Sequence, residues 1–172
     1  MATVSFLIPT IGRTSLGAAI MSTGARKGDE VIVVPDIERS GGWGNAQRNE
    51  GMLRATCDYI SFMDDDDWYV PMARQIIEDA IQESGGNRPI LFKMRYPNGE
   101  TLWKTKEVVP GNIGSPMILV PNDKKMLGTF PGRRNMADFL FVDAWKWPKG
   151  SIMWSEEVIA HLGHNNTGDT LH

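Results

Sequence analysis

The chain changes its pattern of apolar and polar residues about halfway along its length. In the first half, short continuous apolar runs alternate with segments whose apolar residues recur at helical spacing. The apolar runs predict buried strands at 4–8, 30–35 and 59–63. The other segments predict helices within 16–23, 49–56 and 71–83. This alternation predicts a βαβαβα unit with a mostly parallel sheet, in which Pro9 ends the first strand.

The second half has a different pattern. Two apolar segments flank Pro97-Asn98-Gly99 and predict an antiparallel hairpin, because Asn-Gly supplies the positive φ angles of a tight turn. The hairpin strands are expected at 90–96 and 101–106. A further strand is expected at 116–121, a helix within 135–147 and a last strand at 158–162. No linker or repeat interrupts the chain, so we expect one domain, 1–172, with halves 1–85 and 86–172.

Polar residues follow each of the first three predicted strands. Thr10 follows the first strand, Asp36 the second and the four carboxylates Asp64 to Asp67 the third. Ligands of open α/β sheets bind beyond the carboxyl ends of the strands, so these residues are expected at one edge. Four adjacent like charges repel one another, and a bound divalent cation would offset that repulsion. The pattern favours a cation site, with a solvated acidic turn as the alternative.

Several familiar motifs are missing. The chain has no G-x-G-x-x-G fingerprint after the first strand and no G-x-x-x-x-G-K-[ST] phosphate loop. A calcium loop beginning at Asp64 would need glycine and glutamate where Tyr69 and Gln75 stand. The remaining possibility is Mg²⁺ or Mn²⁺, held by one or two carboxylates and completed by a phosphate ligand.

Composition and charge narrow the class of protein. The chain is 41% hydrophobic and 23% charged, which is typical of a soluble globular protein. It has no apolar run near the roughly 20 residues of a membrane span and no secretory signal, so we expect a cytoplasmic protein. The first half holds 7 basic and 13 acidic residues, and the second holds 11 and 8. The first half therefore suits a cation and the second an anionic partner.

Four motifs occur in a set order: SFLIPTIGR, DEVIVVPD, AQRNEG and DYISFMDDDDWYVP. In this order they resemble the nucleotide-sugar half of the GT-A fold glycosyltransferases, in particular the inverting glycosyltransferase family 2. The resemblance covers the first half in detail and the second half more loosely. It implies an α/β GT-A (nucleotide-diphospho-sugar transferase) fold, with a mostly parallel sheet in a Rossmann-like first half and an antiparallel hairpin in the second half.

The resemblance also implies an activity and a set of site residues. The activity is metal-dependent transfer of a sugar, with inversion, from a nucleotide diphosphate sugar such as a UDP-sugar to an acceptor hydroxyl. The implied donor-binding residues are Pro9, Thr10, Arg13, Asp36, Arg48, Asn49, Asp64 and Asp65. Asp66 is the implied ligand of Mn²⁺ or Mg²⁺ in the family's DXD motif, with Asp65 and Asp67 left open because all are aspartates. His161 or His164 would complete the metal site.

The resemblance places the catalytic base at Asp138, within GTFPGRRNMADFLF. Ala137 stands where the family has a glutamate, so Asp138 could instead be a helix first-turn residue, and Asp143 is a weaker candidate. Residues 88–149 hold 11 basic and 5 acidic residues, which permits an anionic acceptor such as modified DNA or a phosphorylated glycan. Two other functions stay open: a nucleotidyltransferase that makes a nucleotide sugar, and a non-catalytic nucleotide-sugar-binding module.

Overall fold

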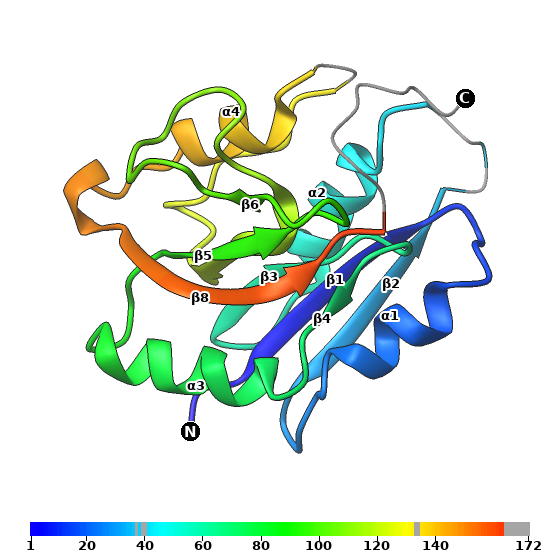
Figure 1. Ribbon diagram of the computed structural model, residues 1–172, viewed down its shortest axis with the longest axis horizontal. Coiled ribbons are helices and arrows are strands. Elements are labelled where there is room, and N and C mark those ends of the chain that lie inside the picture. Colours follow the sequence, from blue (N-terminus) through cyan, green and yellow to red (C-terminus); the bar gives the residue numbers. More distant parts are fainter. Residues whose placement is uncertain (37, 39–40, 133–134, 164–172) are drawn as a thin grey trace.

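The computed structural model describes residues 1–36, 38, 41–132 and 135–163. In this part of the chain, strands form an eight-stranded sheet with helices on both faces (Figure 1). The strand order is β2-β1-β3-β7-β5-β8-β4, and β6 pairs with β5 outside this path. The chain therefore builds one continuous sheet from both halves of the sequence, as a mixed α/β architecture.

The first half forms the predicted parallel unit. Its strands are β1 (Val4–Thr10), β2 (Glu30–Pro35) and β3 (Tyr59–Phe62), and its helices are α1 (Leu16–Ser22) and α2 (Asn45–Arg54). Both neighbours of β1 run parallel to it, which is why all seven of its residues are buried. The prediction that Pro9 ends this strand is wrong. Pro9 stays in register with Val34 and the ladder continues to Thr10, because proline lacks only the N–H group.

The second half adds short and antiparallel strands. The first half ends with β4 (Trp68–Tyr69) and α3 (Ala73–Glu83), and the elements of the second half are β5 (Ile90–Arg95), β6 (Thr101–Leu102), η1 (Ser115–Met117), β7 (Ile118–Pro121), α4 (Ala137–Asp143), η2 (Lys149–Ser151) and β8 (Met153–His161). The predicted hairpin is present as β5 and β6, although β6 ends at Leu102. β7 runs antiparallel to β3 and β5, whereas β8 runs parallel to β5. The complete sheet is therefore mixed.

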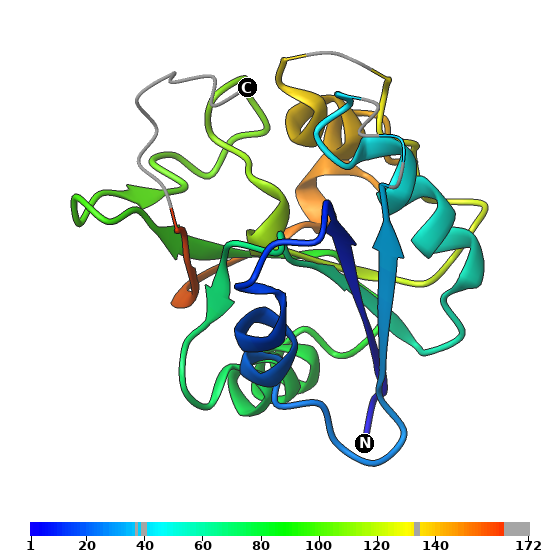
Figure 2. The same ribbon diagram turned by 90° about the vertical axis from the view of Figure 1, so that its right-hand side faces the viewer.

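The helices divide between the two faces of the sheet. α1 and α3 lie on one face, and α2 and α4 lie on the other (Figure 2). Phe62 of β3 makes edge-to-face ring contacts with Phe130 and with Phe141 of α4. These contacts hold α4 over the end of β3. Within the described part of the chain, no helix combines the length and apolar character needed to cross a membrane.

Candidate functional site

The polar residues that follow the first three strands meet at the carboxyl edge of the sheet. The backbone N–H of Asp36, after β2, donates to the Thr10 carbonyl at 2.7 Å. The Thr10 hydroxyl donates to Oδ2 of Asp65 at 2.6 Å. Asp65 belongs to the acid loop, a name used here for residues Asp64 to Asp67. The structure thus brings together three features that the sequence separates, as the order of parallel strands predicted.

Arg13 lies across the acid loop. Its Nη1 pairs with Asp65 at 2.7 Å and with Asp66 at 2.9 Å. Asp65 is buried and also accepts the Ile11 N–H at 3.2 Å, so its carboxylate holds the loop after β1. The side chains of Arg13 and Asp66 are 44% and 28% exposed. Of Arg13, Asp65 and Asp66, the first and the last are therefore exposed enough to contact a ligand that enters from solvent.

Arg48 reaches the acid loop from α2 and is buried. Its Nη2 pairs with Asp64 and donates to the Ser115 hydroxyl at 3.2 Å. Its Nη1 donates to the Trp43 carbonyl at 2.7 Å. The Asp64 side chain is 30% exposed, so one edge of its carboxylate can still face a ligand. Arg48 therefore lies behind Asp64, away from the opening of the site.

Two other predicted donor residues have packing contacts. Both ends of the Asn49 side-chain amide bind the backbone of Phe130 at 2.8 Å, which joins α2 to the segment before α4. Pro9 packs against Gly44, at which an added Cβ would lie 2.7 Å from the Pro9 Cβ. Gly44 also has a φ of +75°, so this turn needs glycine twice over. Asn49 and Pro9 shape the walls of the site through these contacts.

Asp67 is the buried end of the acid loop. It is 2% exposed, and its Oδ1 accepts the Gly163 N–H at 2.8 Å. Its Oδ2 is buried without a hydrogen-bond partner among the described residues. Burial, with a further contribution from the charge of Asp64, raises the pKa of Asp67 to about 8. Gly163 lies so close to the loop that an added Cβ would overlap the Asp66 carbonyl oxygen.

Asp138 joins the site from the first turn of α4. Burial raises its pKa to about 6, the positive charge of Arg48 opposes that rise, and the negative charge of Asp64 adds to it. A backbone hydrogen bond from Ser115 favours the ionised form. Burial likewise raises the pKa of Tyr96 to about 12, with Asp138 contributing. A carboxyl group far along the sequence therefore shares one electrostatic environment with the acid loop.

Of the two predicted histidine ligands, the structure describes only His161. His161 ends β8 beside β4, and its ring stacks on Trp68 with the ring centroids 6.3 Å apart. His164 lies outside the described residues. Within the described ranges, no group of three or more His, Cys, Asp or Glu side chains is arranged to hold a metal ion. A cation at the acid loop would therefore take part of its coordination from a bound ligand.

Sequence reasoning missed Ser115, Tyr96 and Gly163. Ser115 lies in the 3-10 turn η1, and no local pattern links it to Arg48. The sequence places Tyr96 only in the predicted hairpin, and its closeness to Asp138 depends on the packing of α4. Gly163 gives a weak signal, as a glycine directly after the predicted last strand. All three come from the second half of the chain, which carries the fewest motifs.

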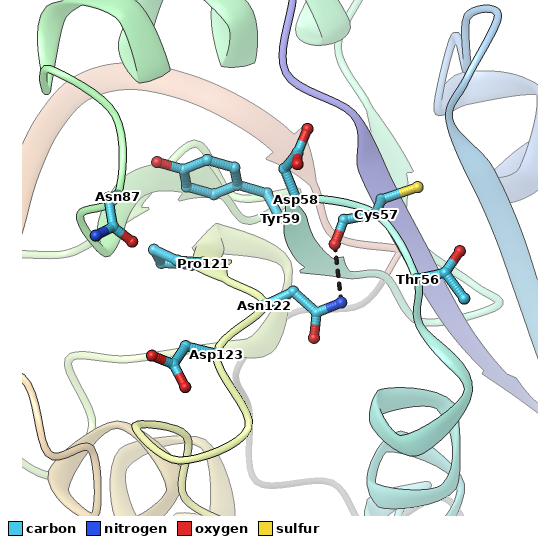
Figure 3. A pocket seen from close by; sticks show the side chains of 8 residues that line it. All are labelled: Thr56, Cys57, Asp58, Tyr59, Asn87, Pro121, Asn122 and Asp123. Atoms are coloured by element: carbon cyan, nitrogen blue, oxygen red, sulfur yellow. Dashed lines mark hydrogen bonds between the residues drawn. The ribbon is translucent and has the colours of Figure 1, made fainter.

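A hollow at the opposite edge of the sheet is separate from this site (Figure 3). It lies where β3 begins, whereas the acid loop follows the end of that strand. Its lining residues are Thr56, Cys57, Asp58, Tyr59, Asn87, Pro121, Asn122 and Asp123. The carboxylate of Asp58 is already bound to the backbone and hydroxyl of Thr3, and Asn122 donates to the Cys57 carbonyl. These contacts are structural.

Comparisons with known proteins agree with this geometry. The model of the family described as Glycosyl transferase family 2 matches residues 17–136. No curated protein matches the chain. The structure resembles S. aureus TarS 1-349 in complex with UDP-GlcNAc, with a TM-score of 0.72 and 16% identity over 98% of this chain and 60% of that one. It also resembles the same protein in complex with UDP, with a TM-score of 0.68 and 18% identity over 92% and 60%.

A longer S. aureus TarS structure is similar as well, with a TM-score of 0.69 and 17% identity over 94% of this chain and 36% of that one. The chain therefore spans 60% or less of the length of these TarS structures. Identities this low show a shared fold. The predicted GT-A fold is confirmed, with its parallel first half and its antiparallel hairpin.

Proposed function

Because the chain belongs to glycosyl transferase family 2, we propose that it is a metal-dependent glycosyltransferase. It would move a sugar from a nucleotide diphosphate sugar to an acceptor hydroxyl with inversion. The observation that carries the proposal is the meeting of the acid loop with Asp138 around Arg48. Donor-binding carboxylates and a carboxylate suited to act as a base then face one site from opposite halves of the chain.

The donor is proposed to be a UDP-sugar. TarS 1-349, whose fold this chain shares, has been solved with UDP-GlcNAc and with UDP. In this chain the carboxyl edge of the sheet presents Thr10, Asp36 and the acid loop. Arg13, with its partly exposed guanidinium, can bind the negatively charged diphosphate once it turns from Asp66. The proposed nucleotide pocket therefore lies between the end of β1 and the acid loop.

The cation is proposed to be Mn²⁺ or Mg²⁺ at Asp66. These ions are commonly bound in proteins by one or two carboxylates together with substrate phosphates, which fits a site with fewer than three clustered ligands. Asp66 is the most suitable ligand because its side chain is 28% exposed, whereas that of Asp65 is 4% exposed and is bound to Thr10. Arg13, which pairs with both carboxylates, would have to release Asp66. His161 or His164 as a further ligand stays a prediction. When bound, the cation offsets negative charge on the departing diphosphate.

Asp138 is proposed to act as the base. Its carboxylate takes the proton of the acceptor hydroxyl while that oxygen attacks the anomeric carbon, and the bond from that carbon to the diphosphate breaks. Attack from the face opposite the leaving group inverts the anomeric centre. With a pKa near 6, Asp138 is mostly ionised at neutral pH and is more basic than an ordinary aspartate.

The acceptor is proposed to carry a hydroxyl, and the basic excess of residues 88–149 suits an anionic acceptor such as modified DNA or a phosphorylated glycan. The donor proposal does not depend on this choice. A neutral acceptor would use the same base and the same donor site. Transfer rates to charged and uncharged acceptors at low and high salt would separate the two cases, because ionic attraction weakens with salt.

A thermal-shift measurement tests the donor and the metal together. UDP-GlcNAc with Mn²⁺ is expected to raise the melting temperature of the wild type, since a ligand that binds the native state stabilises it. Asp66→Ala should lose the part of that shift that depends on Mn²⁺. An equal Mn²⁺-dependent shift in both proteins would contradict the assignment of Asp66.

Product analysis tests the reaction. Incubation with UDP-GlcNAc, Mn²⁺ and an acceptor panel is expected to release free UDP. Release or consumption of pyrophosphate would point instead to a nucleotidyltransferase. Donor binding without turnover of any kind would point to a non-catalytic binding module.

A further inference from the structure

The guanidinium group of Arg48 is buried within the protein. Its side chain is 4% exposed. Nη1 donates to the Trp43 carbonyl at 2.7 Å and to Asn45 Oδ1 at 3.3 Å, while Nη2 contacts Asp64 and the Ser115 hydroxyl. The guanidinium carbon lies 5.4 Å from the centre of the Phe130 ring. A donor phosphate could reach Arg48 only by displacing these contacts.

Among the described residues, the same guanidinium is a buried cation close to several carboxylates. Its charge acts on Asp138 and favours the ionised carboxylate. Within the described part of the chain, the groups that shift the pKa of Asp138 are Arg48 from α2, Asp64 from the acid loop and the Ser115 backbone from η1. Among these, Arg48 alone carries positive charge.

We propose that Arg48 is a positioning residue that holds Asp64 on the donor side and the Ser115 turn on the Asp138 side, and that balances the charge of both carboxylates. It is thus an internal link between the donor carboxylates and the proposed base, and it does not bind the donor itself. The effect of this link on catalysis rests on the proposed function. Its effects on the position of Asp64 and on the protonation of Asp138 are independent of that function.

The shape of the side chain matters as well as its charge. A guanidinium is a planar fork that can bind the Trp43 carbonyl with one nitrogen and Asp64 with the other. A lysine at this position would keep the positive charge but offers a single nitrogen. A methionine would keep most of the length and lose both. Arg48→Lys, Arg48→Met and Ser115→Ala therefore separate the fork, the charge and the link to η1.

The direct test measures the protonation of Asp138 without substrate. Carboxyl ¹³C NMR titration, with the Asp138 signal assigned from an Asp138→Asn sample and with chelator present, reports its midpoint in each folded variant. In Arg48→Met the midpoint should rise by about one pH unit or more, because an opposite charge has been removed. In Arg48→Lys and Ser115→Ala it should stay closer to the wild type. An unmoved midpoint in Arg48→Met would overturn the proposal.

Donor affinity and rate complete the test. Arg48→Lys should weaken UDP-GlcNAc binding on the order of tenfold, since Asp64 loses its fixed partner. In Arg48→Met the acid limb of the kcat/KM profile should move up with the Asp138 midpoint. A residue with only a packing role would lower the melting temperature of both variants and leave both midpoints in place. If Arg48→Met does not fold, Arg48→Gln takes its place.

The two proposals fail in distinguishable ways. If the wild type transfers no sugar to any acceptor, the proposed reaction is wrong, and the NMR titration still decides whether Arg48 controls Asp138. If the wild type transfers sugar while the titration midpoint of Asp138 is the same in Arg48→Met as in the wild type, the proposed reaction stands and the proposed role of Arg48 is wrong.

Discussion

The described part of the protein contains two buried arginines bound to carboxylates, one at each edge of the sheet, and their surroundings differ. Arg74 of α3 lies at the amino edge. It binds Asp29 through Nε at 2.7 Å, the Ala2 carbonyl through Nη2 at 2.7 Å and Glu78 through Nη1 at 3.2 Å. Although burial tends to raise the pKa of Asp29, its hydrogen bonds to Arg74 and to two backbone N–H groups hold that pKa below its usual value. Charge and hydrogen bonding are well matched at this edge.

At the carboxyl edge, the single positive charge of Arg48 faces several carboxylates. It faces Asp64, Asp67 and Asp138, and the pKa values of the last two are raised. Its own Nε is buried without a partner among the described residues. The same kind of ion pair therefore stabilises the fold at the amino edge. At the carboxyl edge it lies beside carboxyl groups whose pKa values are raised. Perturbed carboxyl groups of this kind cluster at functional sites, which is why the active site is proposed at the carboxyl edge.

The largest expected effect is a loss of activity on substitution of Asp138 at the carboxyl edge. Asp138→Asn should lower kcat by about 10²- to 10⁴-fold, because the base is lost, while UDP-GlcNAc affinity stays unchanged. Its melting temperature should not fall, since the amide removes a carboxyl group that is costly to ionise in the folded state. UDP release and calorimetry measure the two quantities.

Asp143→Asn is the matched control, because Asp143 ends the same helix and pairs with Lys149 on the surface. It should keep wild-type turnover. Full turnover in Asp138→Asn, or an equal loss in Asp143→Asn, would remove Asp138 as the base.

The next effect is on stability at the amino edge. Arg74→Met should lower the free energy of unfolding by about 3–5 kcal/mol, because Asp29 and Glu78 are left buried without their cation. Turnover per folded molecule should stay the same. Urea denaturation and an activity assay on the folded fraction check both parts. A loss of turnover at unchanged stability would show that the two edges are not separate in function.

A smaller effect appears in the pH dependence of stability, measured in chelator. The folded pKa of Asp67 is about 8 and the ordinary value is 3.8, so between these values the native state holds a proton that the unfolded state has lost. Stability contributed by this group therefore falls as pH rises, by no more than about 1.4 kcal/mol per pH unit. For Asp29, with a lowered pKa, stability is instead lost as pH falls below its ordinary value.

Urea unfolding of the wild type and of Asp67→Asn at several pH values between 5 and 8 measures this slope. The variant should be the flatter of the two, and the difference between them should grow with pH. Parallel curves would mean that Asp67 is ionised in the folded protein.

The smallest effect concerns the segment after β8. Gly163→Ala should destabilise the protein by about 1 kcal/mol and weaken donor binding slightly, because the added Cβ pushes against the Asp66 carbonyl. Gly17→Ala is the control, since an added Cβ in α1 meets nothing within 4 Å. A Gly163→Ala protein with unaltered Mn²⁺-dependent donor binding would show that the acid loop tolerates movement here.

Local pattern predicted much of the first half. The strand at 30–35 has the bounds of β2, and the third strand differs from β3 by one residue. α2 begins at Asn45, earlier than predicted, because the glycine-rich turn before it is shorter than its composition suggested. β8 begins at Met153 and not at 158, since the polar residues Ser155, Glu156 and Glu157 interrupt the apolar run in its first part. Short apolar strands with both faces covered are the elements that pattern predicts best.

The sequence by itself determined that Thr10, Asp36 and the acid loop lie at one edge, because each follows a strand of the same parallel unit. Only the tertiary structure gave four identical aspartates different surroundings: Asp64 pairs with the buried Arg48, Asp65 is buried and bound to Arg13, Asp66 is partly exposed and Asp67 is buried. Only the tertiary structure brought Ser115 and Asp138 to Arg48. Strand order follows from local hydrophobic pattern, whereas burial and charge balance depend on which distant segments pack together.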